Sequence, residues 1–308
     1  MANPVFELGR SLLRQTTWAR LRRVEAMLLE AEQRQKREDR WRRRTRQQLD
    51  ALIRHVALTG SGLVAPGTLA HRRFHLYSQN EEDGLTLALL AAAGVTTRTF
   101  VEIGSGQSGG NSAVLARELG WSGLMVEGHR PHARKLRALV ASNPDVTVAC
   151  EYVTSDGFNA LLKAHGLKGE IDFLSIDIDS IDYWLLDALK QVSPRVLVME
   201  YNAHFGPRRA VTLPDAAVPS PRPKGYFGAS LAALAKRARG KGYRLVCCEE
   251  SGVNAYFLRD DVAPDVPGLT PEAAYRAPAD GGDYLDDTEK ALDIYTVIEQ
   301  RGLPLVSV

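Results

Sequence analysis

Short apolar runs alternate with helical stretches along most of the chain from residue 84 onward. Seven of these runs have the length and the flanking turn residues that strands require, and the stretches between them show helical spacing of apolar residues. The predicted strands are 99–103, 123–127, 146–149, 171–177, 195–200, 243–248 and 254–259. The predicted helices are near 84–93, 111–119, 131–141, 157–165, 182–190 and 228–239. This alternation predicts an α/β fold with a mostly parallel sheet covered by helices on both faces.

The last two predicted strands are joined by only five residues, EESGV. A connection this short joins antiparallel neighbours, so the sheet should close with a hairpin. The sequence therefore predicts a Rossmann-like, seven-stranded, mostly parallel sheet with a C-terminal antiparallel hairpin. Ligands of such sheets bind at the carboxyl ends of the strands, and we expect the functional residues there.

Residues 21–56 show a different pattern, with apolar positions spaced by three and four. This spacing predicts a long helix with a coiled-coil tendency, through which the protein would form a homo-oligomer. Between Trp18 and His55 there are twelve Arg and Lys residues against six Asp and Glu. The basic run is explained either by a solvated helix face or by contact with acidic lipid or polysaccharide. Nucleic acid is disfavoured, because the run offers a single tryptophan for stacking.

Glycine and small residues at 60–68 indicate a linker. We therefore expect three regions: an N-terminal helical extension at 1–60, the α/β domain at 61–262 and an acidic C-terminal extension with one helix at 263–308. That last helix is predicted at Asp286–Arg301, and the proline-rich stretch Pro207–Lys224 is predicted to be a loop. From Asp260 onward, eleven acidic residues stand against three basic ones.

Composition is that of an ordinary globular protein. The chain has 308 residues, 44% of them hydrophobic, and a net charge of +2. Its three cysteines, Cys150, Cys247 and Cys248, fit neither a disulfide framework nor a zinc site. No apolar run approaches the roughly 18 residues of a membrane span, and the first residues lack a signal-peptide pattern. These features predict a soluble, cytoplasmic protein.

The stretch TFVEIGSGQSGG, residues 99–110, carries the first chemical signal. It predicts a buried strand that runs into a glycine turn and then a helix. Gly104, Gly106 and Gly109 allow the backbone to approach a ligand, which the helix N-terminus also faces. Glu102, at the strand end, would repel a dinucleotide pyrophosphate and would favour a ligand with a cationic amino acid end.

The second predicted strand ends in Glu127, which is followed by Gly128 and His129. A carboxylate at this position, 23 residues after Gly104, can accept hydrogen bonds from both hydroxyls of a ribose. Gly128 would leave room for an adenine ring against the backbone.

The arrangement E-x-G-x-G resembles the first motif of class I S-adenosylmethionine-dependent methyltransferases. The runs YSQNEEDG, VEIGSG, GWSGLMVEG and DFLSIDIDSIDYW together resemble the FkbM-like branch of that family. The resemblance implies O-methylation of a sugar, polysaccharide or natural-product hydroxyl, and a cofactor role for the region around Gln79 and for Asn111. The candidate cofactor-binding residues are Gln79, Glu102, Gly104, Ser105, Gly106, Asn111, Glu127, Gly128 and His129.

Acidic side chains also end the fourth and fifth predicted strands. Asp177 and Asp179 should lie on one side of the fourth strand by its period of two. Glu200, Asn202 and His204 end the fifth. The candidate catalytic residues are Asp177, Asp179, Glu200 and His204. Two hypotheses stay open: a Mg²⁺ site made by Asp177, Glu200 and Asn202, or a metal-free base.

Two other functions compete with an O-methyltransferase that acts on a small-molecule or glycan acceptor. The G-x-G-x-x-G spacing is shared with nicotinamide-dependent oxidoreductases, although Glu102 and the closing hairpin disfavour them. A non-catalytic binding protein with the same fold is the second alternative.

Overall fold

The computed structural model describes Gln35 and residues 73–216, 225–278 and 293–308. The chain divides into two compact units, 1–56 and 57–308, and the fold below is that of the second. The predicted helix at 21–56, apart from the helical Gln35, and the linker at 60–68 lie outside the described residues and stay predictions. The first residues of the helix predicted at 286–301 also lie outside them.

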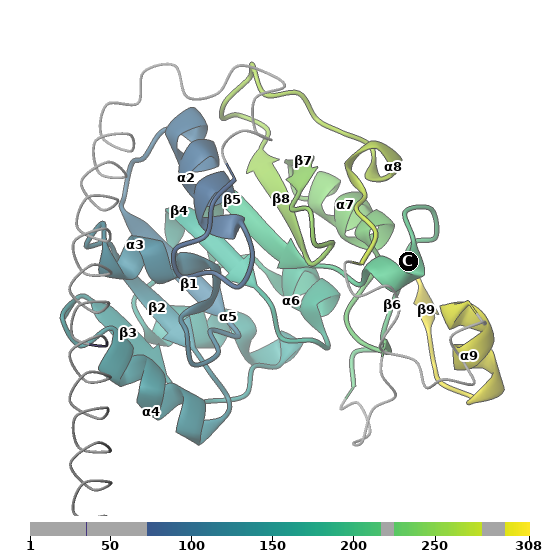
Figure 1. Ribbon diagram of the computed structural model, residues 1–308, viewed down its shortest axis with the longest axis horizontal. Coiled ribbons are helices and arrows are strands. Elements are labelled where there is room, and N and C mark those ends of the chain that lie inside the picture. Colours follow the sequence, from purple (N-terminus) through teal and green to yellow (C-terminus); the bar gives the residue numbers. More distant parts are fainter. Residues whose placement is uncertain (1–34, 36–72, 217–224, 279–292) are drawn as a thin grey trace, which may run out of the picture. The chain divides into compact units, whose positions relative to one another are not determined.

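Seven strands form one sheet in the order β3-β2-β1-β4-β5-β8-β7 (Figure 1). They are β1 (Thr99–Ile103), β2 (Ser122–Val126), β3 (Val146–Ala149), β4 (Gly169–Ile176), β5 (Val192–Glu200), β7 (Tyr243–Cys248) and β8 (Asn254–Arg259). The first five are parallel, and β8 runs antiparallel to both of its neighbours. The predicted Rossmann-like sheet with its C-terminal antiparallel pair is therefore confirmed.

The strand order reverses at β1. The chain moves from β1 outward to β2 and β3 on one side, and then crosses to β4 and β5 on the other. The connections that follow β1 and β4 leave the sheet in opposite directions, which opens a crevice at the carboxyl ends of these two strands.

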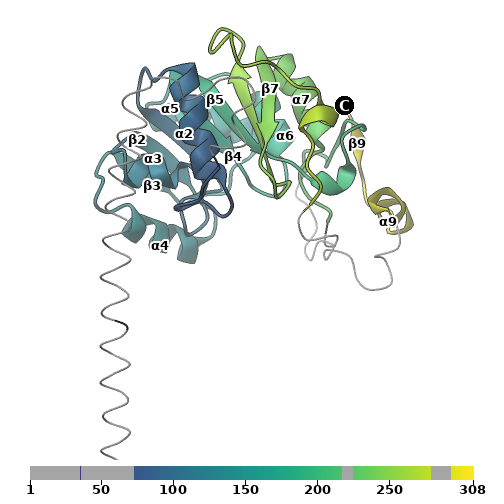
Figure 2. The same cartoon turned by 45° about the horizontal axis from the view of Figure 1, so that its top comes forward.

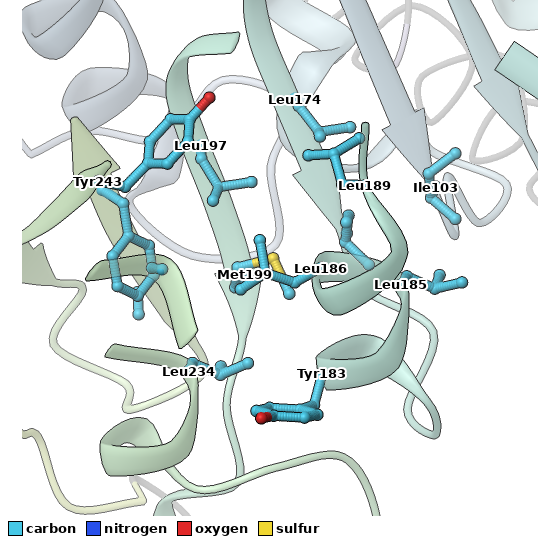
Figure 3. Close-up of a cluster of buried hydrophobic side chains, with 14 of the residues drawn as sticks. Ile103, Leu174, Tyr183, Leu185, Leu186, Leu189, Leu197, Met199, Leu234 and Tyr243 are labelled. Carbon is cyan, nitrogen blue, oxygen red and sulfur yellow. The ribbon is translucent and has the colours of Figure 1, made fainter. Parts of the chain in front are cut away.

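Three helices cover one face of the sheet: α5 (Ser155–Ala164), α6 (Asp182–Ala188) and α7 (Leu231–Arg239). Their apolar side chains join alternate strand residues in one hydrophobic cluster (Figure 3). Ile103, Leu174 and Leu197 come from three parallel strands, and Leu185 and Leu234 come from two of the helices. The alternation follows from the strand period of two, which sends every second side chain to the same face.

The opposite face is covered by α2 (Glu82–Ala93), which packs against β5 and β8, and by the 3₁₀ turn η2 (Gly110–Ser112) with α3 (Ala113–Arg117) (Figure 2). The helix α4 (Arg130–Leu139) packs beside β3. The helix predicted at 111–119 is thus shorter than expected and begins as a 3₁₀ turn that packs against β1 and β4. No helix in the described part of the chain has the length and apolar character that crossing a bilayer requires.

A second, two-stranded sheet joins β6 (Val211–Thr212) to β9 (Val306–Ser307) in antiparallel register. Two short helical elements accompany it, η3 (Ala203–Phe205) and α9 (Ile294–Gln300), whereas α8 (Pro271–Ala274) packs against β7 and α7. A separate hydrophobic cluster contains Phe205, Val211, Leu213, Tyr226, Ile294 and Ile298. The prediction that 207–224 holds no strand is wrong at Val211–Thr212, because a two-residue strand has no period that a sequence could reveal. The C-terminal segment therefore packs against the segment that follows β5.

Candidate functional site

A cavity of about 780 Å³ lies at the carboxyl ends of β1, β2 and β4. Seven of the nine predicted cofactor-binding residues line it: Gln79, Gly104, Ser105, Gly106, Asn111, Glu127 and Gly128. Two predicted catalytic residues, Asp177 and Asp179, line it as well. Glu102, His129, Glu200 and His204 are absent from its lining.

The glycine turn ties three strand ends together. The N–H groups of Gly104 and Ser105 both donate to the Val126 carbonyl at 3.0 Å, and the Asp177 N–H donates to Ile103 at 2.9 Å. Gly104 has φ 88°, and a Cβ atom there would lie 1.6 Å from the Asp177 carbonyl oxygen. Only glycine fits a position that combines positive φ with such a close backbone approach. Gly106 also has a positive φ, 58°, but a Cβ there would meet nothing.

The Glu102 side chain helps to fix the conformation of the glycine turn. Its side chain is fully buried, and Oε1 accepts a hydrogen bond from the Asn111 N–H at 3.1 Å. A Cβ atom on Gly110 would come within 2.2 Å of the same oxygen. Burial raises the pKa of Glu102 to about 7. Glu102 therefore does not line the cavity but fixes the turn and Asn111, which does line it, and its role in cofactor binding stays a prediction.

Glu127 lines the cavity as predicted, and its Oε1 accepts a hydrogen bond from the His129 N–H at 2.7 Å. That bond orients the carboxylate and leaves its second oxygen available to a ligand. The His129 ring does not line the cavity; it packs edge-on against His132, with ring centroids 4.4 Å apart. His132 does line the cavity, with Nδ1 4.0 Å from Glu127 Oε1. Helical spacing within α4, at residue i+3 from His129, was the signal that could have identified it.

The segment after β3 supplies a wall that sequence reasoning missed. Glu151, Tyr152 and Val153 line the cavity, and Tyr152 is 82% exposed. A Cβ atom on Gly128 would lie 2.6 Å from the Tyr152 ring, so the space over Gly128 that was predicted to receive adenine is filled by this ring. An aromatic residue just beyond the carboxyl end of a predicted strand was the available signal. Its exposed face offers a ligand a flat apolar surface.

The loop after β4 is held by an aspartate that was not predicted. The buried Asp182 accepts hydrogen bonds from the N–H groups of Ile178 at 2.8 Å and Ser180 at 2.9 Å. The strand ends at Ile176, so the period of two does not extend to Asp177 and Asp179 as expected. Asp179 instead has φ 54°, because the chain turns there. Both carboxylates still reach the cavity, but from a loop.

Asp177 and Glu200 form a carboxyl pair joined by a hydrogen bond. Burial raises the pKa of both groups well above the ordinary range. Like-charge repulsion adds to this effect: Asp182, Asp179 and Glu102 act on Asp177, and the first two also act on Glu200. Two adjacent carboxylates cannot both ionise at low cost, so the pair holds a proton to higher pH than an isolated carboxyl does.

Hydrogen bonds within the fold fix the positions of Asn202 and His204. The Asn202 amide donates to the carbonyls of Gly225 at 2.8 Å and Phe227 at 2.9 Å, and its Oδ1 accepts from the His204 N–H. The side chain caps η3 and does not line the cavity, so the structure lends no support to its predicted role as a Mg²⁺ ligand. Across the described ranges, no group of three or more His, Cys, Asp or Glu side chains is arranged to hold a metal ion. His204 lies in η3, half-buried and away from the cavity lining.

Two further residues, Glu82 and Asn254, line the cavity from α2 and from the start of β8. They are joined by a hydrogen bond of 3.2 Å from Asn254 Nδ2 to Glu82 Oε1. They come from positions 172 residues apart, so no sequence spacing could have indicated the pair.

The ionisable side chains that line the cavity are mostly acidic. Five carboxylates line it: Glu82, Glu127, Glu151, Asp177 and Asp179. His132 is the single basic side chain among its described lining residues, which include no Lys or Arg. Such a cavity raises the local concentration of cations and disfavours phosphate groups.

No protein-family model matches the chain, and no curated protein matches it. Solved structures do share its fold. The O-methyltransferase from Bacillus cereus in complex with SAH is 19% identical, with 68% of this chain and 96% of that chain covered and a TM-score of 0.40. The N-terminal domain of EvdMO1 with SAH bound is 15% identical, with 67% and 94% covered and a TM-score of 0.38. A SAM-dependent methyltransferase from Aquifex aeolicus is 12% identical, with 66% and 98% covered and a TM-score of 0.34. No residue role follows for this chain from similarity at this level.

Proposed function

We propose that this protein is an S-adenosylmethionine-dependent methyltransferase, and that it transfers the methyl group to a hydroxyl oxygen. The observation that carries the proposal is the acidic lining of the cavity, which holds five carboxylates and, among its described lining residues, no Lys or Arg. S-adenosylmethionine carries a sulfonium and an ammonium group, and both are stabilised by such a wall. The pyrophosphate of a nicotinamide dinucleotide would be repelled by it, which disfavours the oxidoreductase alternative.

The donor side of the cavity fits this cofactor. Glu127, oriented by the His129 N–H, has a free oxygen for the ribose hydroxyls. The bare backbone of Gly104 and Gly106 gives the methionine portion a close approach. The exposed ring of Tyr152 provides a face on which adenine can stack.

Bound S-adenosylmethionine supplies an electrophilic methyl group on a positively charged sulfur. The acceptor oxygen forms a bond to that carbon while the carbon–sulfur bond breaks, and the bonding pair stays on sulfur as a neutral thioether. The hydroxyl proton must then pass to a base. Asp177 is the best placed, because it lines the cavity and because burial and neighbouring carboxylates raise its pKa. His204 remains the second candidate, although it is not part of the lining.

The Mg²⁺ alternative would have to rely on Asp177 and Glu200 without Asn202. Chelation distinguishes the two routes, since a metal-free transfer withstands it and a metal-assisted transfer does not.

Calorimetry with the full-length protein tests the proposed function. We expect S-adenosylmethionine to bind and NAD⁺ not to bind. Glu127→Ala removes the charged acceptor of two ribose hydroxyls, so affinity should fall by about 10- to 100-fold. Glu127→Gln keeps the shape and an acceptor oxygen, and should lose less. Tight NAD⁺ binding, or an unchanged affinity in Glu127→Ala, would refute the assignment.

A further inference from the structure

The wall of the cavity formed by Glu82 and Asn254 has no role in the cofactor site as proposed. Hydrogen bonds hold the side chains of this wall in place. Glu82 is 1% exposed, and its Oε2 accepts from the Asn80 N–H at 2.7 Å. Its Oε1 accepts from Asn80 Nδ2 at 3.0 Å and from Asn254 Nδ2 at 3.2 Å. The neighbouring Asp83 holds the preceding turn, because its Oδ2 accepts four hydrogen bonds from that turn.

The network determines which way the Asn254 amide faces. Glu82 Oε1 accepts the hydrogen bond from Asn254 Nδ2, so the amide presents its NH₂ group to Glu82. The amide oxygen, Oδ1, therefore points away from Glu82. The backbone of Asn254 is fixed independently, because its N–H donates to Glu249 Oε1 at 3.2 Å.

Asn254 Oδ1 is buried and has no hydrogen-bond partner in the described part of the chain. The residue is 3% exposed and lines the cavity. Unpartnered buried amide oxygens are uncommon in native proteins, because each loses its hydration without compensation. Here the missing partner can be supplied by a ligand in the cavity that donates a hydrogen bond.

The surroundings of this oxygen restrict the charge of such a ligand. Asn254 lies opposite Glu200 in the β5–β8 register, and Glu82 and Asp177 line the same cavity. No cationic side chain of the described lining residues is available on this wall to balance an anion. Arg209, which follows β5 in the sequence, lies over the Tyr295 ring, 4.1 Å from its centroid.

We propose that Asn254 Oδ1 accepts a hydrogen bond from the methyl acceptor, and that the acceptor therefore presents an O–H or N–H donor there and carries no negative charge. This inference rests on the proposed function. It adds a positioning residue for the acceptor and a charge class for the substrate.

Three hexoses that differ in charge test the inference: glucose, glucosamine and glucose 6-phosphate. Their binding to the full-length protein saturated with S-adenosylhomocysteine is measured by saturation-transfer NMR titration. We expect glucose and glucosamine to bind and glucose 6-phosphate not to bind. Asn254→Ala should weaken glucose binding by about 5- to 10-fold, the worth of one hydrogen bond. Calorimetry on the same variant should give an S-adenosylmethionine affinity within about 3-fold of the original.

The double variant Glu82→Gln with Asn254→Asp is the rescue. The glutamine amide can donate to the new aspartate, which then presents an oxygen to the cavity in place of Oδ1. We expect glucose binding to return and glucosamine to gain a further 3- to 10-fold, about the effect of a charge-assisted hydrogen bond. Asn143→Ala is the matched control, because the Asn143 amide donates to Ala116 and Trp121 and its oxygen accepts from Asp145.

Three results would overturn the inference: glucose 6-phosphate that binds as well as glucose, a failure of all three hexoses to bind, or a glucose affinity unchanged by Asn254→Ala. Failure of S-adenosylmethionine to bind the unmodified protein would instead overturn the proposed function. The two failures are therefore distinguished by separate measurements.

Discussion

The two sides of the cavity are built differently. The donor side comes from β1, β2, β3 and the turns that directly follow them, between residues 99 and 153. The other side, which we assign to the acceptor, combines the loop after β4, the end of β5, the start of β8 and the turn before α2. Its residues are separated by up to 172 positions, as in the Glu82–Asn254 hydrogen bond. One side is thus encoded by neighbouring residues, and the other exists only once distant elements have packed.

From this difference we expect substitutions on the donor side to act by disturbing the backbone geometry. Substitutions on the acceptor side should act by removing contacts between distant elements. Three substitutions test the contrast, and they are taken in order of the effect expected.

The largest effect is expected at Gly104. Gly104→Ala places a Cβ atom 1.6 Å from the Asp177 carbonyl oxygen at a position with φ 88°. The clash is with backbone, so the ends of β1 and β4 must separate. We expect a loss of more than about 4 kcal/mol in the free energy of unfolding, measured by denaturant titration, and no cofactor binding.

Gly106→Ala is the matched control, because its φ is also positive, 58°, but a Cβ atom there meets nothing. This substitution should lower the free energy of unfolding by about 1 kcal/mol, through backbone strain alone. Equal losses in the two variants would mean that the close approach to Asp177 does not restrict this turn.

The contrast between Gly104 and Asn254 also shows what the sequence could predict. Helical and strand periods identified all seven strands of the main sheet. The glycine turn, the end of the second strand and the family resemblance together identified seven residues that line the cavity. Asp182, Tyr152 and Asn254 were missed because their roles depend on a loop conformation, an exposed ring and a cross-sheet contact. The two-residue strands β6 and β9 were missed because pairing alone defines them.

An intermediate effect, dependent on pH, is expected at Glu102. Its pKa is raised by burial to about 7, so between about pH 4.5 and 7 the folded state binds more protons than the unfolded state. Its contribution therefore lowers stability as pH rises through that window. Glu102→Gln cannot ionise and keeps an acceptor oxygen for the Asn111 N–H. The variant should gain stability relative to the original protein as pH rises, by on the order of 1–3 kcal/mol at pH 8.

Urea titrations of both proteins at pH 5 and pH 8 measure this difference. Glu170→Gln is the control, because the hydrogen bond from Arg259 lowers the pKa of Glu170. Its titration therefore lies below pH 5, and the stability difference between this variant and the original should be nearly the same at pH 5 and pH 8. A stability difference for Glu102→Gln that does not change with pH would show that Glu102 is ionised in the fold.

The smallest effect is expected at Tyr275, on the acceptor side. Its hydroxyl donates to the Ala203 carbonyl at 2.9 Å, just beyond the end of β5, and its ring packs edge-on against Tyr201. Tyr275→Phe keeps the ring and removes one hydrogen bond, so stability should fall by about 1 kcal/mol. Because the donor side makes no use of this contact, S-adenosylmethionine affinity should stay within about 2-fold.

Hydrogen exchange should meanwhile quicken for the amides of 203–206, which this contact holds. Tyr152→Phe is the control, since its exposed hydroxyl makes no hydrogen bond to the residues that the structure describes. A large drop in cofactor affinity for Tyr275→Phe would contradict the proposed independence of the donor and acceptor sides. It would mean that the end of β5 and the glycine turn move as one unit.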